Sequence, residues 1–358
     1  MIGAQYYEPI YYSIITIGTF ITLSNIDCID ERESNRFPLL LCCMLILFIG
    51  LRPVSQKYFV DMYGTAMQFS LWAQDSVRFS FDVQNLLYDN LRLNMATLGF
   101  TYKPFFLLIA AIYFGGIYYV CSRMFNTRSL LPFFVCLAAF STFSFATNGV
   151  KAGSAASVFL IAMALQHDGK RLASLIVAIL SIGFHHSMVL PVFAFAVCLY
   201  IKKDKLYFYI WVFCSLLAFF HITYFQDLFA TITADAGNEH AAEYLTGVGQ
   251  ATKGFRIDFI LYSAVPIIFG RWLSFMEIDK SEQYQYILNV YTLVNSIWML
   301  CMYAEFTNRI AYLSWFMYPI VLIYPFINED YLSRKTGLMK IFVCGHLFFT
   351  LFMEIIYY

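Results

Sequence analysis

Charged residues are scarce in this sequence. Asp, Glu, Lys and Arg make up 13% of its 358 residues, while hydrophobic residues make up 60% and aromatic residues 20%. Soluble domains carry about 25% charged and about 45–50% apolar residues. The composition therefore excludes a water-soluble globular enzyme and a disordered chain. The formal net charge is zero, from 23 basic and 23 acidic residues, so the charge balance indicates no partner and we expect no nucleic-acid binding.

The sequence also lacks the motifs of nucleotide- and metal-dependent enzymes. It has no Walker A motif, so ATP is not the expected energy source. It has no DxD, GxSxG or HExxH sequence either. None of its nine cysteines lies in the two longest connections, 52–103 and 223–256, which argues against an extracellular disulfide framework. We therefore expect neither a metal nor another cofactor.

Long apolar runs are what the chain does contain. A bilayer core of roughly 30 Å needs about 20 helical residues. We predict an all-α polytopic membrane protein: a single transmembrane domain over residues 1–358, with about 12 transmembrane helices. The expected spans are 10–26, 37–51, 104–122, 130–147, 151–166, 172–185, 187–201, 206–222, 257–276, 286–304, 310–327 and 338–357. The run 172–201 is too long for one helix, and His185-His186-Ser187 divides it.

Basic residues lie on alternate connections between these spans. The set comprises Arg32, Arg36, Arg123, Arg128, Lys170, Arg171, Lys202, Lys203, Lys205, Arg271, Lys280, Arg334, Lys335 and Lys340. The positive-inside rule places these connections in the cytoplasm. Both termini and the long loops 52–103 and 223–256 then face outward. The first loop alternates aromatic and charged residues, so we expect short amphipathic helices at the membrane surface.

Polar residues gather at the predicted outer ends of the spans. They are Arg52, Asn148, Lys151, His185, His186, Arg256, Asp258, Glu305, Asn308 and Arg309. An ionisable residue near membrane depth is costly and is by default a functional candidate. Arginine pairs bidentately with phosphate oxygens, and histidine can transfer a proton near neutral pH. The set predicts a site for an anionic lipid head group such as a lipid pyrophosphate.

Each of these residues also has a structural explanation. Arg52 or Arg309 alone could be an interfacial anchor, and the two histidines could bind carbonyl groups at a helix turn. The sequence Gly149-x-x-x-Gly153 is more often a helix-packing motif than a chemical one. Asp61 in a long wet loop is usually just solvated. We favour the functional interpretation because the residues share one predicted face.

The order of these motifs resembles a known family. Arg52 is followed by Asp61 and Tyr63, by Asn148-Gly149-x-Lys151, by His185-x-Ser187 and by Asn308-Arg309. This pattern is similar to the EpsG family of Wzy-like bacterial polysaccharide polymerases. Two positions depart from the family: Lys151 stands where arginine is usual, and Val60 precedes the loop aspartate where glycine is common.

The resemblance implies a multi-pass protein of the bacterial inner membrane with its site facing the periplasm. Such a polymerase, in O-antigen, capsule or exopolysaccharide synthesis, joins oligosaccharide repeat units carried on undecaprenyl pyrophosphate. Donor and acceptor are both lipid-linked, and the lipid pyrophosphate leaves. The expected partners are these two substrates, membrane lipids and a chain-length regulator.

A mechanism follows as a hypothesis. Arg309, Arg52 and Arg256 would bind the donor pyrophosphate. His185 would be the general base on the acceptor hydroxyl, with Asp61 as its rival. The residues expected to position sugar or phosphate are Asn148, Lys151, Asn308, Tyr63, His186 and Ser187.

Three other functions stay open at this point. An O-antigen-ligase-like enzyme would transfer the glycan once, so a ladder of products favours a polymerase and a single addition favours a ligase. A flippase for the lipid-linked repeat would need polar residues through to the inner face, and few are present. A membrane acyltransferase would place its histidine on the cytoplasmic side.

Overall fold

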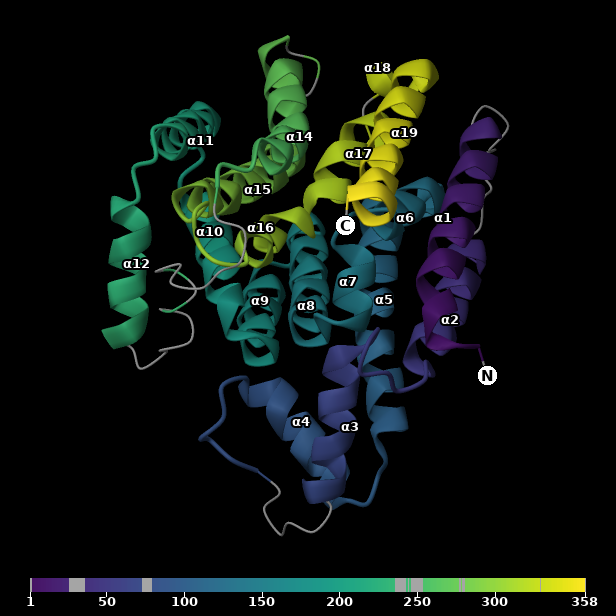
Figure 1. Cartoon of the computed structure of the whole chain (residues 1–358). Helices are drawn as coiled ribbons and strands as arrows, with labels where there is room; N and C mark the ends of the chain where they lie inside the picture. Colours follow the sequence, from purple (N-terminus) through teal and green to yellow (C-terminus); the bar gives the residue numbers. More distant parts are fainter. Residues whose placement is uncertain are drawn as a thin grey trace. The chain divides into compact units, whose positions relative to one another are not determined.

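The computed structural model is all-helical over the residues it describes, which confirms the predicted fold class. These residues are 2–25, 36–72, 79–235, 243, 245, 254–276, 278, 281–328 and 330–357, and they contain no named strand (Figure 1). They divide into two compact units. Unit 1 is Met1–Val192 with Ile323–Tyr358, and unit 2 is Phe193–Leu322.

Unit 1 is built around two helices that pack on each other, α5 and α8, with α2 against α5 and α9 against α8. Its helices are α1 (Tyr7–Ser24), α2 (Arg36–Gly50), α3 (Val60–Trp72), α4 (Leu86–Thr97), α5 (Tyr102–Phe125), α6 (Leu130–Leu137), α7 (Thr142–Thr147), α8 (Val150–His167), α9 (Arg171–Phe184), the start of α10 (Val189–Tyr200), the end of α17 (Tyr318–Asn328), α18 (Asp330–Ser333) and α19 (Thr336–Phe352). A π-helical turn, Met353–Tyr357, follows α19. The short helices expected in the first long loop are present as α3 and α4.

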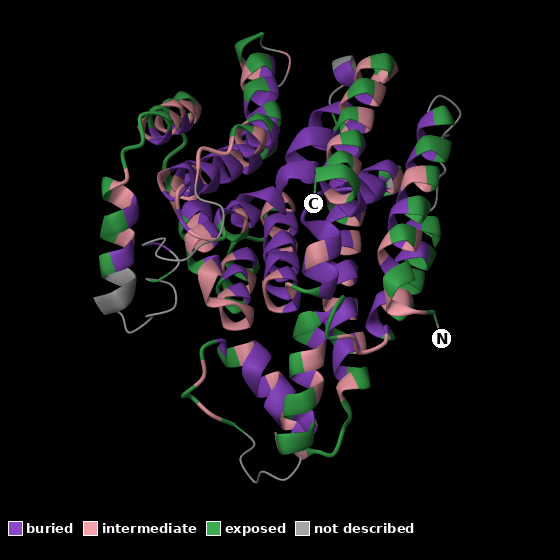
Figure 2. Cartoon of the chain, viewed as in Figure 1, coloured by how far each residue is buried: buried purple, intermediate pink, exposed green. Residues whose placement is uncertain are grey.

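The exposed surface of unit 1 is apolar along its outer helices. In α1, Ile17, Phe20 and Ile21 are exposed, and the opposite face of the same helix is buried (Figure 2). Exposed apolar faces of this kind mark surfaces that contact a membrane or a partner. Together with the long apolar helices, they indicate a membrane protein.

Unit 2 contains α11 (Asp204–Phe219), α12 (Tyr224–Asp235), α14 (Ile257–Phe275), α15 (Glu282–Leu300) and α16 (Thr307–Trp315), with the rest of α10 and α17. Two buried tryptophans tie three of these helices together. The indole of Trp298 donates to the Thr307 hydroxyl at 2.9 Å, and that of Trp315 donates to the Ser263 hydroxyl at 2.7 Å. Buried indole N–H groups need such partners, so these bonds fix α16 against α14 and α15.

The structure does not support the predicted count of about 12 spans. Five described helical stretches are long and apolar enough to cross a bilayer: 102–125, 150–167, 257–275, 307–328 and 336–357. A sixth results if α11 and the start of α12, bent by 98°, form one broken span. Three further apolar helices, 36–50, 171–184 and 186–200, are shorter, and the run 130–147 breaks at residues 138–141. The apolarity of the sequence therefore predicted too many transmembrane spans, because it does not show where a helix bends or ends.

The charged connections of unit 1 nevertheless fall at two opposite ends of α5 and α8. At one end, the Arg123 guanidinium donates to the Asp168 carboxylate at 2.6 and 2.9 Å. There too the Asn328 amide donates to the Met124 carbonyl at 3.3 Å. Arg52 lies at the other end, over the ring of Phe106 in the first turns of α5. The sequence predicted this separation, and which end faces the cytoplasm stays a prediction.

Two adjacent glycines in α5 provide a test of this packing. A Cβ added to Gly116 would collide with the Ser157 side chain and lie 2.9 Å from its carbonyl oxygen, whereas one added to Gly115 meets no heavy atom within 4 Å. Overpacking typically costs about 1–3 kcal/mol. We expect Gly116→Ala to lower the unfolding temperature in detergent clearly and Gly115→Ala to leave it unchanged or slightly raised. Equal unfolding temperatures for the two variants would contradict the α5–α8 contact.

Candidate functional site

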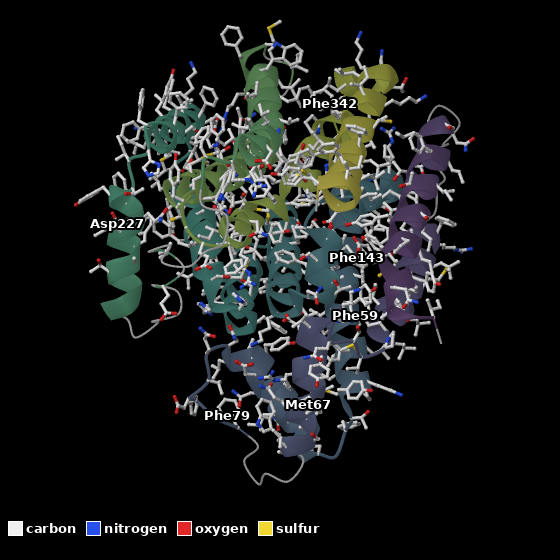
Figure 3. All side chains as sticks on the ribbon, in the orientation of Figure 1. Phe59, Met67, Phe79, Phe143, Asp227 and Phe342 are labelled. Carbon is white, nitrogen blue, oxygen red and sulfur yellow. The ribbon has the colours of Figure 1, made fainter. Side chains whose placement is uncertain are left out.

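Arg52 is a buried cation at the end of α2. Arg52 is only 2% exposed. Its guanidinium donates to the carbonyls of Ile49 at 2.8 Å and Thr147 at 2.9 Å. The guanidinium lies over the rings of Phe59, labelled in Figure 3, at 5.3 Å and Phe106 at 5.1 Å. Burial lowers the pKa of Arg52 to about 10, which still leaves it charged at neutral pH. Arg52 therefore brings a positive charge to the junction of α2 with the α7–α8 connection.

Asn148 joins that connection to the start of α3. Its side-chain oxygen accepts from the Val60 N–H at 3.0 Å, and its side-chain nitrogen donates to the Tyr58 carbonyl at 3.1 Å. This clamp sets the first turn of α3, where Asp61 is exposed and Tyr63 is half-buried. The charge of Asp61 opposes the lowering of the Arg52 pKa. Asp61 is thus an accessible carboxylate within electrostatic reach of a buried arginine.

A second carboxylate, Asp89 in α4, connects that helix to the start of α8. One of its oxygens accepts from Arg92 at 3.1 Å and lies 3.9 Å from the Lys151 amine. The other accepts from the Asn85 backbone N–H at 3.0 Å. Arg92 also donates to the Gln68 side chain of α3 at 2.7 Å. Asp89 and Arg92 were not among the candidate residues predicted from the sequence, although their i, i+3 spacing is typical of an ion pair on a helix.

Tyr88 lies among these charges. It is fully buried, and its phenol oxygen has no hydrogen-bond partner among the described residues. Burial raises its pKa, and the charges of Arg92, Asp61, Asp89 and Arg52 all act on it. Tyr88 therefore lies within reach of charged groups from α3, from α4 and from Arg52, which follows α2.

The histidine pair forms the predicted break after α9. His185 is extended, with φ −153° and ψ 121°, and caps a short 3-10 turn at His186–Met188. Its Nδ1 accepts from the Ser187 N–H at 3.3 Å. The side-chain oxygen of Asn85 accepts from the His186 N–H at 3.1 Å. The turn is thus attached to α4, the helix that also carries Asp89.

The state of His185 limits its chemistry. Burial, with smaller contributions from His186 and Lys151, lowers its pKa to about 3. The ring is then neutral at pH 7. Its Nδ1 also lies 2.5 Å from the Ser187 hydroxyl oxygen. Burial disfavours the protonated ring, which weakens His185 as a general base. Asp61, the rival base, is an exposed carboxylate in the first turn of α3.

In unit 2, Arg256 is paired with its near neighbour Asp258. Two parallel bonds of 2.9 and 2.6 Å join the guanidinium to the carboxylate, and the guanidinium lies 3.6 Å from the Phe259 ring centre. This bidentate geometry is the strong form of the ion pair. A phosphate would have to displace Asp258 to take its place.

Arg309 is exposed at the N-terminus of α16, next to the half-buried Asn308. Its guanidinium lies 4.5 Å from the Phe306 ring centre. Phe306 has a left-handed backbone, φ 52°, a conformation that costs about 1–3 kcal/mol in a residue with a side chain and is found mainly at functional sites. The buried Thr307 hydroxyl anchors the helix start on Trp298. Arg309 thus lies on a fixed helix terminus, where the backbone dipole also favours an anion.

The family model of the EpsG family matches residues 35–358. This chain belongs to the EpsG family. That is the family of Wzy-like polysaccharide polymerases, so its activity lies in polysaccharide biosynthesis. No curated protein and no solved structure matches the chain. The matched range includes every candidate residue from Arg52 to Arg309.

In this EpsG-family chain, the candidate residues are distributed over both units. Unit 1 brings Arg52, Asp61, Asn148, Lys151 and the 185–187 turn together through Asn148, Asn85 and Asp89. Unit 2 holds Arg256, Asn308 and Arg309. Among the described residues, no three His, Cys, Asp or Glu side chains are grouped to hold a metal.

Two substitutions separate the capping role of His185 from a role as a base. Asparagine can place an oxygen where Nδ1 lies and is a preferred helix cap. We expect His185→Asn to retain stability and part of the polymer formation, because it keeps the cap but loses the group at the Nε2 position, and His185→Ala to lose about 0.5–2 kcal/mol of stability. Thermal unfolding and product gels of both variants test this. If His185→Asn is as inactive as His185→Ala while remaining folded, the base assignment would be favoured.

Proposed function

We propose that this chain polymerises oligosaccharide repeat units carried on undecaprenyl pyrophosphate, at the outer face of the bacterial inner membrane. A hydroxyl of the new lipid-linked repeat attacks the anomeric carbon of the growing chain. A glycosidic bond forms, the bond from that carbon to the pyrophosphate oxygen breaks, and the hydroxyl proton passes to a base. The pyrophosphate already activates the donor, so the reaction requires no nucleotide.

The observation that carries this proposal is the charged cluster of unit 1. Arg52 and Arg92 are buried, and Lys151 is partly accessible, with a side chain 37% exposed. Asp89 is paired with Arg92 and lies near Lys151, and Asp61 acts on Arg52, so two carboxylates offset three cations and the cluster keeps an excess of positive charge. Buried charges of one sign favour a ligand of the other sign, because their mutual repulsion is expensive in a low dielectric. A pyrophosphate, with its multiple negative charges, fits this requirement.

The geometry suggests distinct tasks for the members of unit 1. The Lys151 amine is the accessible cation and would contact a phosphate oxygen directly. Arg52, held by two backbone carbonyls, would act through its field and by positioning the Thr147–Asn148 turn. Asp61 would accept the proton of the acceptor hydroxyl. The Nε2–H of His185 would donate to a sugar or phosphate oxygen.

In unit 2, we assign the leaving pyrophosphate to Arg309. Its exposed guanidinium can offer a pair of parallel N–H groups to a phosphate, and Asn308 precedes it at the same helix start. Arg256 donates two bonds to Asp258, so we assign it to shaping the start of α14. Stabilising the charge that develops on a leaving group is usually a large catalytic contribution.

Purified protein in nanodiscs tests the function directly. The native undecaprenyl-pyrophosphate repeat is added without nucleotide or added metal, and products are resolved on a gel. We expect a ladder of chains that differ by one repeat. If a single glycan is added to another acceptor, the protein is a ligase and the polymerase proposal is wrong. If the substrate moves across the bilayer and no new glycosidic bond forms, the protein is a flippase and the polymerase proposal is wrong.

A further inference from the structure

Two phenylalanines of unit 1 present their rings to solvent. Phe81 is 84% exposed and Phe79 is 51% exposed. Their ring centres are 4.9 Å apart, and the ring planes meet at 74° (Figure 3 labels Phe79). The two rings form an exposed aromatic corner in the segment that leads into α4.

This corner is held by hydrogen bonds and not by burial of the rings. The buried Asn90 accepts from the Ser80 N–H at 2.7 Å and donates to the Ser80 carbonyl at 2.8 Å. The Ser80 hydroxyl in turn accepts from the Asp82 N–H at 3.1 Å. The residue between the two rings is therefore clamped on both sides of its backbone. A fixed exposed surface loses little conformational entropy when it binds a ligand.

Polar groups next to the corner select among possible ligands. Asp82 follows Phe81 directly in the chain, Gln84 is three residues after Phe81, and both are exposed. A sugar ring has an apolar C–H face, which packs on an aromatic ring, and hydroxyl groups at its edge, which bind carboxylate and amide side chains. An acyl chain packed here would remove water from the Asp82 carboxylate and supply no hydrogen bond in its place. The combination of flat rings with a carboxylate and an amide therefore favours a carbohydrate over lipid.

The corner is also connected to the charged cluster. Asn85 and Asp89 follow in the same segment, and they bind the His186 N–H and the Lys151 amine respectively. A glycan lying on Phe79 and Phe81 would thus contact a segment that is fixed to the groups proposed to act on its reducing end.

We propose that Phe79, Phe81, Asp82 and Gln84 form a carbohydrate-binding platform that holds a sugar unit of the glycan substrate. The assignment of the glycan as substrate rests on the proposed function; binding by the platform does not. The platform lengthens the product, because a retained chain is extended again before it is released.

The experiment measures binding and polymerisation separately. The probe is a soluble, lipid-free oligosaccharide fraction prepared from the surface polysaccharide of the source cells. Its dissociation constant is measured for the full-length protein by titration calorimetry in detergent. The variants are Phe79→Ala with Phe81→Ala, Asp82→Asn, and the control Phe100→Ala, which removes another ring that is 51% exposed.

We expect the double variant to bind the oligosaccharides at least about tenfold more weakly, equivalent to about 1.4 kcal/mol. Asp82→Asn should weaken binding by a smaller factor, and Phe100→Ala should leave it unchanged. In the gel assay the double variant should make shorter chains. All three variants change exposed side chains, so their unfolding temperatures should match that of the wild type.

The two proposals fail in different ways. If the wild type binds the oligosaccharides and the double variant does not, but no ladder forms, the platform stands and the polymerase function is wrong. If a ladder forms and the double variant matches the wild type in affinity and chain length, the platform is wrong and the function stands. Undetectable binding by the wild type, or a change only in the oligomeric state of the double variant, would also overturn the platform.

Discussion

Arg309→Ala is expected to abolish the polymer ladder while leaving the protein folded in the membrane. Removing one group that stabilises charge in a transition state costs about 10²–10³ in rate. A polymer needs many successive additions, so a loss of that size should leave at most the first product. Arg309→Lys keeps the charge but loses the pair of parallel donors, and its activity should lie between those of the wild type and the alanine variant.

The structure explains why the fold should survive this substitution. The start of α16 is held by the buried Thr307 hydroxyl on Trp298 and by the Arg309 backbone N–H on the Phe306 carbonyl at 2.8 Å. Neither bond uses the Arg309 side chain. Arg334→Ala removes another exposed arginine and serves as the control for a general loss of charge. Normal chain lengths in Arg309→Ala would refute its assignment to the leaving group.

Asp89→Ala is expected to have the largest effect on stability among the charged residues of unit 1. It removes the carboxylate that binds the buried Arg92 and leaves the Asn85 N–H without its acceptor. Breaking a buried ion pair from one side typically costs about 3–5 kcal/mol, because the remaining charge is uncompensated. Asp89→Asn keeps the shape and the acceptor oxygen but loses the charge, so it should be less damaging.

A double variant separates stability from positioning. Asp89→Leu with Arg92→Met removes both charges of the pair, and replacing a buried pair by apolar residues is often close to neutral. We expect this variant to recover much of the stability but not the polymer yield, because Lys151 loses its partner on α4. Unfolding in detergent and product gels provide the two measurements.

Asp227→Ala removes an exposed acidic residue of unit 2 (Figure 3) and is the control for the loss of a carboxylate. A surface change of this kind usually stays within about 0.5 kcal/mol. If Asp89→Ala is as stable as Asp227→Ala and makes normal polymer, the proposed role of Asp89 as an anchor is wrong.

The sequence alone determined that this is a membrane protein, that it is helical, and to which family it belongs. The scarcity of charge and the apolar runs indicated a helical membrane protein, and the motifs from Arg52 to Arg309 indicated the EpsG family. The break at His185–Ser187 was also visible, because a polar pair interrupts a run that is too long for one helix. These features are local or compositional, and each can be evaluated without knowing which distant residues meet in the fold.

Only the tertiary structure decided how many helices are long enough to span and what each polar residue binds. Helix length depends on where the backbone bends, as at residues 138–141, and the mean apolarity of a run carries no such information. Asn148 binds the backbone at Tyr58 and Val60, and Lys151 meets Asp89. His185 uses Nδ1 to cap a turn, where it contacts Ser187. Such pairings join segments far apart in the chain, and they are selected by packing because a buried polar group is costly until the fold supplies its partner.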